Sequence, residues 1–134
     1  MHAASSFDYA LIRVVPRVER EEFLNAGVVL FCLTQDFLGA QVALDVARLR
    51  AFSPGIDLEG DLEAVLQHLA SIPLLCAGDP RAGSVARLSR KERFHWLVSP
   101  RSTVVQMSPV HSGICTDPAL ALEQLVAKMV RLLG

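Results

Sequence analysis

Six polar side chains could together form a binding site for a small anion. Four of them fall in the polar segment from Arg90 to Gly113 and two come earlier in the chain: Arg101, Ser102, Gln106, His111, Arg17 and Asn25. A guanidinium makes two-pronged contacts with carboxylate and phosphate groups, and an imidazole changes its charge near neutral pH. These residue types predict an anionic-ligand site near Arg101, Gln106 and His111.

A strand expected at residues 102–108 would position part of this site. Alternate side chains of a strand share one face, which would align four residues: Ser102, Val104, Gln106 and Ser108. A buried face with hydroxyl and amide groups needs hydrogen-bond partners. We therefore expect this face to meet water or to line a polar pocket.

Each of these residues also has a structural interpretation. Arg101 follows a proline and would clamp a loop carbonyl or form a salt bridge, and His111 would cap a carbonyl in its Pro-Val-His-Ser-Gly turn. Cys115 follows His111 by four residues, but a glycine turn between them fixes no thiol–imidazole geometry. The sequence therefore predicts no catalytic residue.

The motifs that mark common catalytic and cofactor sites are missing. The sequence contains no Gly-rich dinucleotide or phosphate loop, no His-Glu-x-x-His zinc motif and no Gly-x-Ser-x-Gly elbow. Cys32, Cys76 and Cys115 are far apart and form no Cys-x-x-Cys pair, a pattern typical of buried thiols in a reducing compartment. We expect no metal and no cofactor.

Basic residues cluster late in a chain of small net charge. The formal net charge of −1 over 134 residues disfavours a protein that coats nucleic acid or anionic membrane by bulk attraction. The segment from Arg81 to Arg101 nevertheless holds six basic residues and one acid, Glu92, with Phe94 and Trp96 between them. Weak nucleic-acid binding through this segment, with bases stacked on the rings, is therefore a minor hypothesis.

The length predicts a single domain over residues 1–134. Residues 1–7 are expected to be frayed, and residues 77–84 to form a mobile loop because they are rich in glycine and proline. The first residues lack the charged and apolar regions of a signal peptide, and no apolar stretch approaches about 18 residues. We therefore expect a cytoplasmic protein.

Apolar periodicity and turn residues predict four strands. The expected strands are residues 8–15, 28–33, 37–45 and 102–108. A polar break at residues 34–36 would make the second and third of these a hairpin. Asn25, Ala26 and Gly27 are expected to reverse the chain before the second strand, and residues 109–113 to turn it after the last.

Helical spacing and capping residues predict five helices. They are expected at residues 18–24, 46–52, 57–72 and 89–97, with a last helix that begins at Pro118. Pro73 would end the third. Ser89 and Glu92 have the Ser-x-x-Glu form of a capping box, and Asp117 precedes the last helix.

The order of these elements predicts an α+β fold. Three strands come first, then a helical middle, a late strand and a terminal helix, without regular strand–helix alternation. This order favours a mixed or antiparallel sheet of about four strands with helices packed mainly on one face.

Three segments carry a resemblance to a known family. They are YALIRVVPRVEREEFLNAGVVLFC, RLRAF and RKERFHWLVSPRSTVVQMSPVHSG, followed by a terminal helix that opens with Asp-Pro. With these motifs the chain resembles the bacterial family called domain of unknown function 3037. The resemblance implies a small bacterial protein without assigned activity, and as partner a HipA-like kinase protein encoded nearby.

Two classes of function compete with nucleic-acid binding. The leading hypothesis is a non-catalytic interaction partner or accessory subunit that binds another protein, or itself as a homo-oligomer, through an apolar patch bordered by arginine. It is motivated by the missing catalytic motifs and by an apolar content of 51%. The alternative is a small anionic-ligand-binding protein or enzyme that uses the six residues named first.

Overall fold

An antiparallel sheet of five strands organises the described part of the chain. The computed structural model describes residues 3–16, 22–52, 60–101 and 103–131. The sheet has the order β3-β2-β1-β4, and β5 also pairs with β1: β1 (Ser5–Val14), β2 (Leu24–Cys32), β3 (Phe37–Val42), β4 (Val105–Met107) and β5 (His111–Cys115). The α+β prediction with an antiparallel sheet is confirmed, with one strand more than expected.

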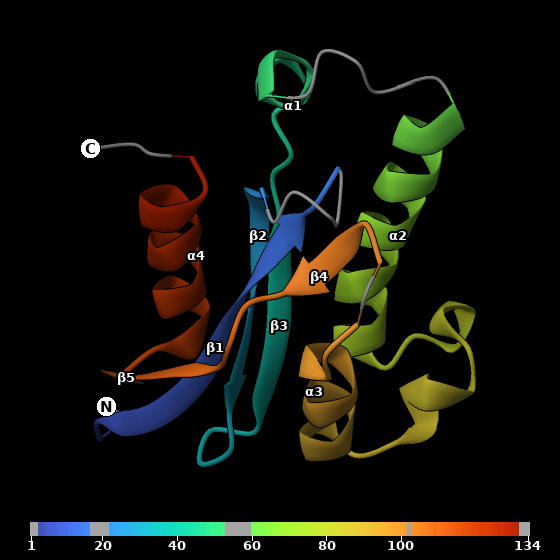
Figure 1. Ribbon diagram of the computed structural model, residues 1–134. Coiled ribbons are helices and arrows are strands. Elements are labelled where there is room, and N and C mark those ends of the chain that lie inside the picture. Colours follow the sequence, from blue (N-terminus) through green and yellow to red (C-terminus); the bar gives the residue numbers. More distant parts are fainter. Residues whose placement is uncertain (1–2, 17–21, 53–59, 102, 132–134) are drawn as a thin grey trace.

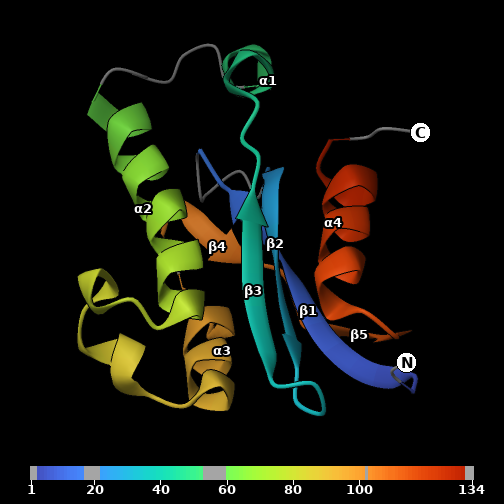
Figure 2. The same ribbon diagram turned by 180° about the vertical axis from the view of Figure 1, so that it is seen from behind.

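Helices cover both faces of this sheet (Figures 1 and 2). They are α1 (Val46–Phe52), α2 (Gly60–Ala77), α3 (Arg90–Val98) and α4 (Pro118–Met129), with the 3-10 turns η2 (Pro80–Ala82) and η3 (Ser84–Arg87). As predicted, most of the helical residues pack on one face, where α2 and α3 lie. The terminal helix α4 covers the opposite face.

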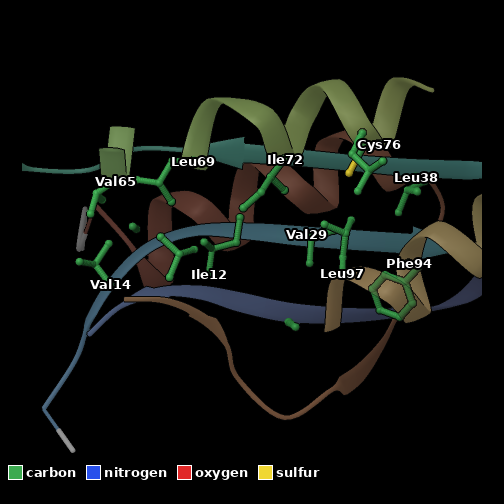
Figure 3. Packing of buried hydrophobic residues seen from close by; sticks show 14 of the residues in the cluster. Ile12, Val14, Val29, Leu38, Val65, Leu69, Ile72, Cys76, Phe94 and Leu97 are labelled. Atoms are coloured by element: carbon green, nitrogen blue, oxygen red, sulfur yellow. The ribbon is translucent and has the colours of Figure 1, made fainter. Parts of the chain in front are cut away.

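The larger core lies between the sheet and α2 with α3 (Figure 3). Ile12 and Val29 point from β1 and β2 toward Leu69 and Ile72 of α2 (Figure 3). Phe94 of α3 stacks on Phe31, with ring centroids 5.5 Å apart. Each large apolar side chain that is buried contributes about 1.5–3 kcal/mol to the free energy of folding. The shared core layer therefore holds α2 and α3 in place relative to each other.

A second core lies under α4. Leu122 and Val126 of this helix pack on Val28 and Leu30 of β2 and on Phe7 of β1. Alternate residues of β2 therefore belong to opposite cores, which explains why its segment reads as an uninterrupted apolar run.

The expected chain reversal at residues 25–27 is wrong, because these residues belong to β2. The pairing with β1 shifts here, since Ile12 faces Gly27 while Arg13 faces Asn25. The extra residue between them makes a bulge, which bends a strand without ending it. A Cβ atom on Gly27 would lie 2.5 Å from Gln41 O of β3, so this glycine permits close strand approach. Of the helix expected at 18–24, residues 18–21 lie outside the described residues.

The late strand and the turn after it also differ from expectation. β4 is limited to Val105–Met107, and the predicted turn at 109–113 is wrong because His111–Cys115 form β5. β4 pairs with the end of β1 and β5 with its beginning, from Ser5 to Tyr9. Residues 5–7 are therefore a paired strand and are not frayed; Met1 and His2 lie outside the described residues.

The third predicted helix continues past its expected end. Pro73 lies inside α2, which runs to Ala77. A proline inside a helix removes one backbone hydrogen bond, but the residues that follow are buried in the core, Leu75 and Cys76 among them. Their burial favours continued helix. Of the expected start of this helix, residues 57–59 lie outside the described residues.

Residues 78–88, which include most of the expected loop, are tied to α3 by Arg93. This side chain is 8% exposed, and its guanidinium donates to Ala86 O at 3.3 Å, Leu88 O at 2.7 Å and Cys76 O at 3.3 Å. The segment forms η2 and η3 rather than irregular loop. One buried cation thus connects the end of α2, η3 and α3.

Both predicted helix starts are confirmed. Ser89 Oγ accepts from Glu92 N, and the Glu92 side chain accepts from Ser89 N, which completes the capping box. Asp117 accepts from the first amides of α4, with Pro118 at the first helical position. Among the described residues, no helix is long and apolar enough to cross a membrane.

Candidate functional site

Two of the predicted site residues, Arg101 and Gln106, line one pocket. Its lining comes mainly from α2, α3 and β4, whose arrangement is drawn in Figure 1. The pocket has a volume of about 70 Å³. Buried apolar side chains form part of its wall: Ile72, Leu75, Leu97 and Val105. Its polar lining includes His68, Ser71, Ser99 and Arg101, and no described carboxylate lines it. The charge of Arg101 is therefore not neutralised inside the pocket.

Trp96 holds the guanidinium of Arg101 at the end of α3. The Cζ atom of Arg101 lies 4.1 Å from the centroid of the Trp96 ring, and Nη2 donates to Trp96 O at 2.8 Å. The ring face attracts a cation, and a carbonyl in the last turn of a helix lacks an intrahelical donor. One of the five guanidinium N–H groups is thus used, and the others have no hydrogen-bond partner among the described residues.

His68 lines the same pocket from α2. Burial lowers its pKa from the ordinary value, and the positive charge of Arg101 lowers it further. The nearby hydroxyls donate to helix carbonyls, Ser71 Oγ to His68 O at 2.6 Å and Ser99 Oγ to His95 O at 2.8 Å. Among the lining side chains, Arg101, the His68 imidazole and the Trp96 indole N–H therefore keep donors that no described residue accepts.

Gln106 reaches the pocket with its strand rather than with its amide group. Val105 and Met107 pack in the core under α2 and α3, so alternation along β4 turns the Gln106 side chain to the other face. There its Nε2 donates to Thr103 O at 2.8 Å. The polar strand face expected at 102–108 is also interrupted by Ser108, which is buried and hydrogen-bonded to the backbone.

The remaining predicted residues do not join this pocket. Asn25 donates from Nδ2 to Met129 O at 3.2 Å, next to α4. His111 begins β5 and packs on Tyr9, with ring centroids 5.5 Å apart. Arg17 and Ser102 lie outside the described residues. The structure thus brings together two of the four predicted residues that it describes.

His111 and Cys115 do not form a nucleophilic pair. They occupy the two ends of β5, where four strand steps separate them by about 13 Å. Burial raises the pKa of the Cys115 thiol, which disfavours the reactive thiolate.

A second candidate region lies at the outer edge of β5. This strand pairs with β1 on one side, and its other side has no strand partner among the described residues. Ile114 at this edge is 78% exposed. A shallow groove of about 590 Å³ runs beside it toward α4 and is lined by Phe7, Ile114, Cys115, Leu120, Leu125 and Lys128, among others.

The comparison with known families decides the identity of the chain. Residues 9–130 match the family model described as "Protein of unknown function (DUF3037)". The protein belongs to the DUF3037 family. No curated protein and no solved structure matches the chain. The match confirms the resemblance carried by the sequence motifs, and both the pocket and β5 of this DUF3037 chain lie within the matched residues.

The pocket of this DUF3037 protein includes two residues that sequence reasoning did not assign to it. His68 lies in a predicted helix, without a polar motif around it, and the sequence marks Trp96 only as a stacking surface for nucleic acid. Packing of α2 against α3 brings His68 to Arg101, whereas Trp96 lies five residues before Arg101 and contacts it locally. A contact between helices so far apart in the chain has no local sequence signal.

Metal binding has no support in the described part of this DUF3037 protein. No group of three or more His, Cys, Asp or Glu residues is placed there to hold an ion. Cys32 and Cys76 are buried as separate free thiols. Two candidate regions therefore remain, the small pocket in which Arg101 has no described ion-pair partner and the outer edge of β5.

Proposed function

We propose that this protein is a non-catalytic interaction protein that assembles through the outer edge of β5, with a second copy of the chain as the occupant. The observation that carries the proposal is a strand edge that no described strand pairs with, next to an Ile114 side chain that is 78% exposed. An unpaired edge offers a row of backbone donors and acceptors to another strand.

The backbone groups available at this edge follow from the pairing of β1. Leu11 directs its amide and its carbonyl toward the chain that follows β4. Alternation along an antiparallel pair then turns Phe7 and its partner Gly113 toward each other. The next residues on either side, Ser112 and Ile114, direct their N–H and C=O groups outward.

A second copy fits this edge by symmetry. A twofold axis at Gly113 would place Ser112 of each copy opposite Ile114 of the other, so that the outward groups of both strands pair. The two Ile114 side chains would then lie on the same face of the joined sheet, and their burial would contribute about 1.5–3 kcal/mol each.

The composition of β5 supports pairing between copies. Sheet edges that must stay unpaired are usually protected by charged side chains or proline. His111–Cys115 contains neither Lys, Arg, Asp, Glu nor proline, so two copies bring no like charges together. The other outer strands are less accessible, since β3 is contacted by both α2 and α4, and β4 is only three residues long and is contacted by α2.

The test is the mass of the protein in solution by size-exclusion chromatography with light scattering, over a range of concentrations. We expect a species of twice the chain mass of 14.6 kDa. Ile114→Lys should yield monomer, because it places two charges at the joint. Ile114→Pro should do the same, since it removes an outward N–H that β1 does not use.

Leu33→Lys is the matched control, because Leu33 is also highly exposed, at 67%, but lies in the turn after β2. It should leave the mass unchanged. A monomer at every concentration would exclude a second copy as the occupant, and a dimer that persists in both Ile114 variants would exclude the β5 edge.

A further inference from the structure

The pocket between α2, α3 and β4 is a separate site from the β5 edge. We propose that it binds a compact oxyanion group, a carboxylate or a phosphate, with Arg101 and His68 as its hydrogen-bond donors. The two regions use different residues and different parts of the edge of β1, since β4 pairs with its end and β5 with its beginning.

The first argument is the contrast between Arg101 and the two described arginines that form ion pairs. Among the described residues, Arg81 pairs with Asp79 and Arg90 pairs with Asp36. Arg101 forms no ion pair there and makes one hydrogen bond. A half-buried guanidinium with unused donors, fixed over an aromatic ring, can donate two parallel hydrogen bonds to the oxygens of a carboxylate or phosphate.

The second argument is the charge and polarity of the lining. Arg101 and His68 are the titratable groups among the described lining residues, and no carboxylate competes for them. Because the Ser71 and Ser99 hydrogens are used on helix carbonyls, they do not donate to a ligand. The pocket thus presents a fixed cation beside an imidazole that an anion would help to protonate.

The third argument is size. The volume of about 70 Å³ corresponds to roughly two water molecules at ~30 Å³ each. Pockets for nucleotide-sized or drug-sized ligands hold about 300–1,000 Å³. The dimensions therefore match a single oxyanion group better than a whole nucleotide.

Two sources can supply this chemistry, a free small anion or the terminal carboxylate of a polypeptide. The probes are inorganic phosphate, acetate and a short peptide with a free carboxyl terminus, with the same peptide amidated. Tighter binding of the free-carboxyl peptide than of acetate assigns the site to a polypeptide end. Equal binding of the two assigns it to free anions.

The experiment is a nuclear magnetic resonance titration of the whole chain at constant ionic strength. We expect saturable shifts of the His68 ring and Trp96 indole signals, with a rise in the His68 pKa at saturation, because a bound anion favours the imidazolium. Arg101→Gln should weaken binding roughly tenfold. Arg87→Gln, an exposed site with the same change of charge, should leave binding unchanged.

The amide spectrum of each variant shows whether its fold is retained. If Arg101→Gln loses its fold, His68→Gln serves instead, because His68 lines the pocket from an exposed position of α2, and weaker binding is expected. The proposal is overturned if shifts are linear with concentration, if chloride produces the same shifts, or if folded Arg101→Gln and His68→Gln bind as the unmodified chain does.

Discussion

The backbone of Leu11 pairs with both the side chain and the main chain of Ser108. Leu11 N donates to Ser108 Oγ at 2.8 Å, and Ser108 N donates to Leu11 O at 2.9 Å. The hydroxyl then donates to Pro109 O at 2.8 Å. β4 and β5 each pair with β1, and Ser108 lies in the gap between these two pairings. Its side chain supplies an acceptor there for the amide of Leu11, which helps to hold both strands against β1.

Removal of this hydroxyl should destabilise the protein. Ser108→Ala would leave the amide of Leu11 without its acceptor in a site where Ser108 is 3% exposed, at a cost of about 1–3 kcal/mol in the free energy of unfolding. Urea denaturation measures it. Ser112→Ala is the control, since Ser112 is exposed and bonds to Asp8 at the sheet edge. Equal stability of the two variants would contradict the role of Ser108.

Arg93 should matter more than any exposed arginine. Arg93→Met keeps an unbranched apolar stem but removes the donors from three carbonyls, so we expect a loss of about 3 kcal/mol. Hydrogen exchange should also accelerate across residues 78–88. Arg90→Met in the same helix removes an exposed ion pair and should cost under about 1 kcal/mol. Similar losses in the free energy of unfolding of both variants would show that the buried contacts of Arg93 do not stabilise the protein more than an exposed ion pair does.

Local chemistry explains which elements were predictable. The caps at Ser89 and Asp117 need residues within one helical turn, and both were predicted correctly. The hairpin of β2 and β3 was predicted for the same reason, because a short polar break separates two apolar runs.

Contacts between distant segments explain the errors. The sequence of β5 is polar and contains Gly113, and it becomes a strand because the first half of β1 offers it an edge. α2 passes Pro73 because the residues beyond it are buried. Of the candidate residues singled out in the sequence, Arg101 and Gln106 line the pocket, while His68 reaches it by helix packing that no local pattern encodes.

Cys76 should make stability fall at alkaline pH. Burial raises the pKa of its thiol from 9.0 to about 12, so the unfolded chain loses this proton first as the pH rises. The stabilisation is present below pH 9 and is lost progressively toward pH 12. At pH 10 the effect should be about 1 kcal/mol.

The measurement compares urea denaturation at pH 7 and pH 10. Cys76→Ala should show a smaller difference between these two conditions than the unmodified chain. Val126→Ala is the control, because it truncates a buried side chain of the other core that carries no titrating group. It should lower stability at both pH values and leave the difference between them unchanged. An unchanged difference in Cys76→Ala would show that the pKa of this thiol is the same in the folded and unfolded chain.

The charge of Arg101 should be measurable at His68. Arg101→Gln removes a positive charge that disfavours the imidazolium, so the pKa of His68 should rise toward 6.5. It should stay below that value, because burial is the larger cause and remains. Titration of the imidazole proton signals gives the pKa directly, and Arg90→Gln, whose partner is Asp36, should leave it unchanged.

The same coupling predicts how stability changes in acid. Because the pKa of His68 is lower in the folded state, the unfolded chain binds the proton first as the pH falls below 6.5. Stability should therefore decrease through this range. It should decrease less in Arg101→Gln, where the pKa of His68 differs less between the folded and unfolded chain. An identical acid profile in both proteins, together with an unmoved His68 pKa, would mean that the guanidinium and the imidazole do not interact across the pocket.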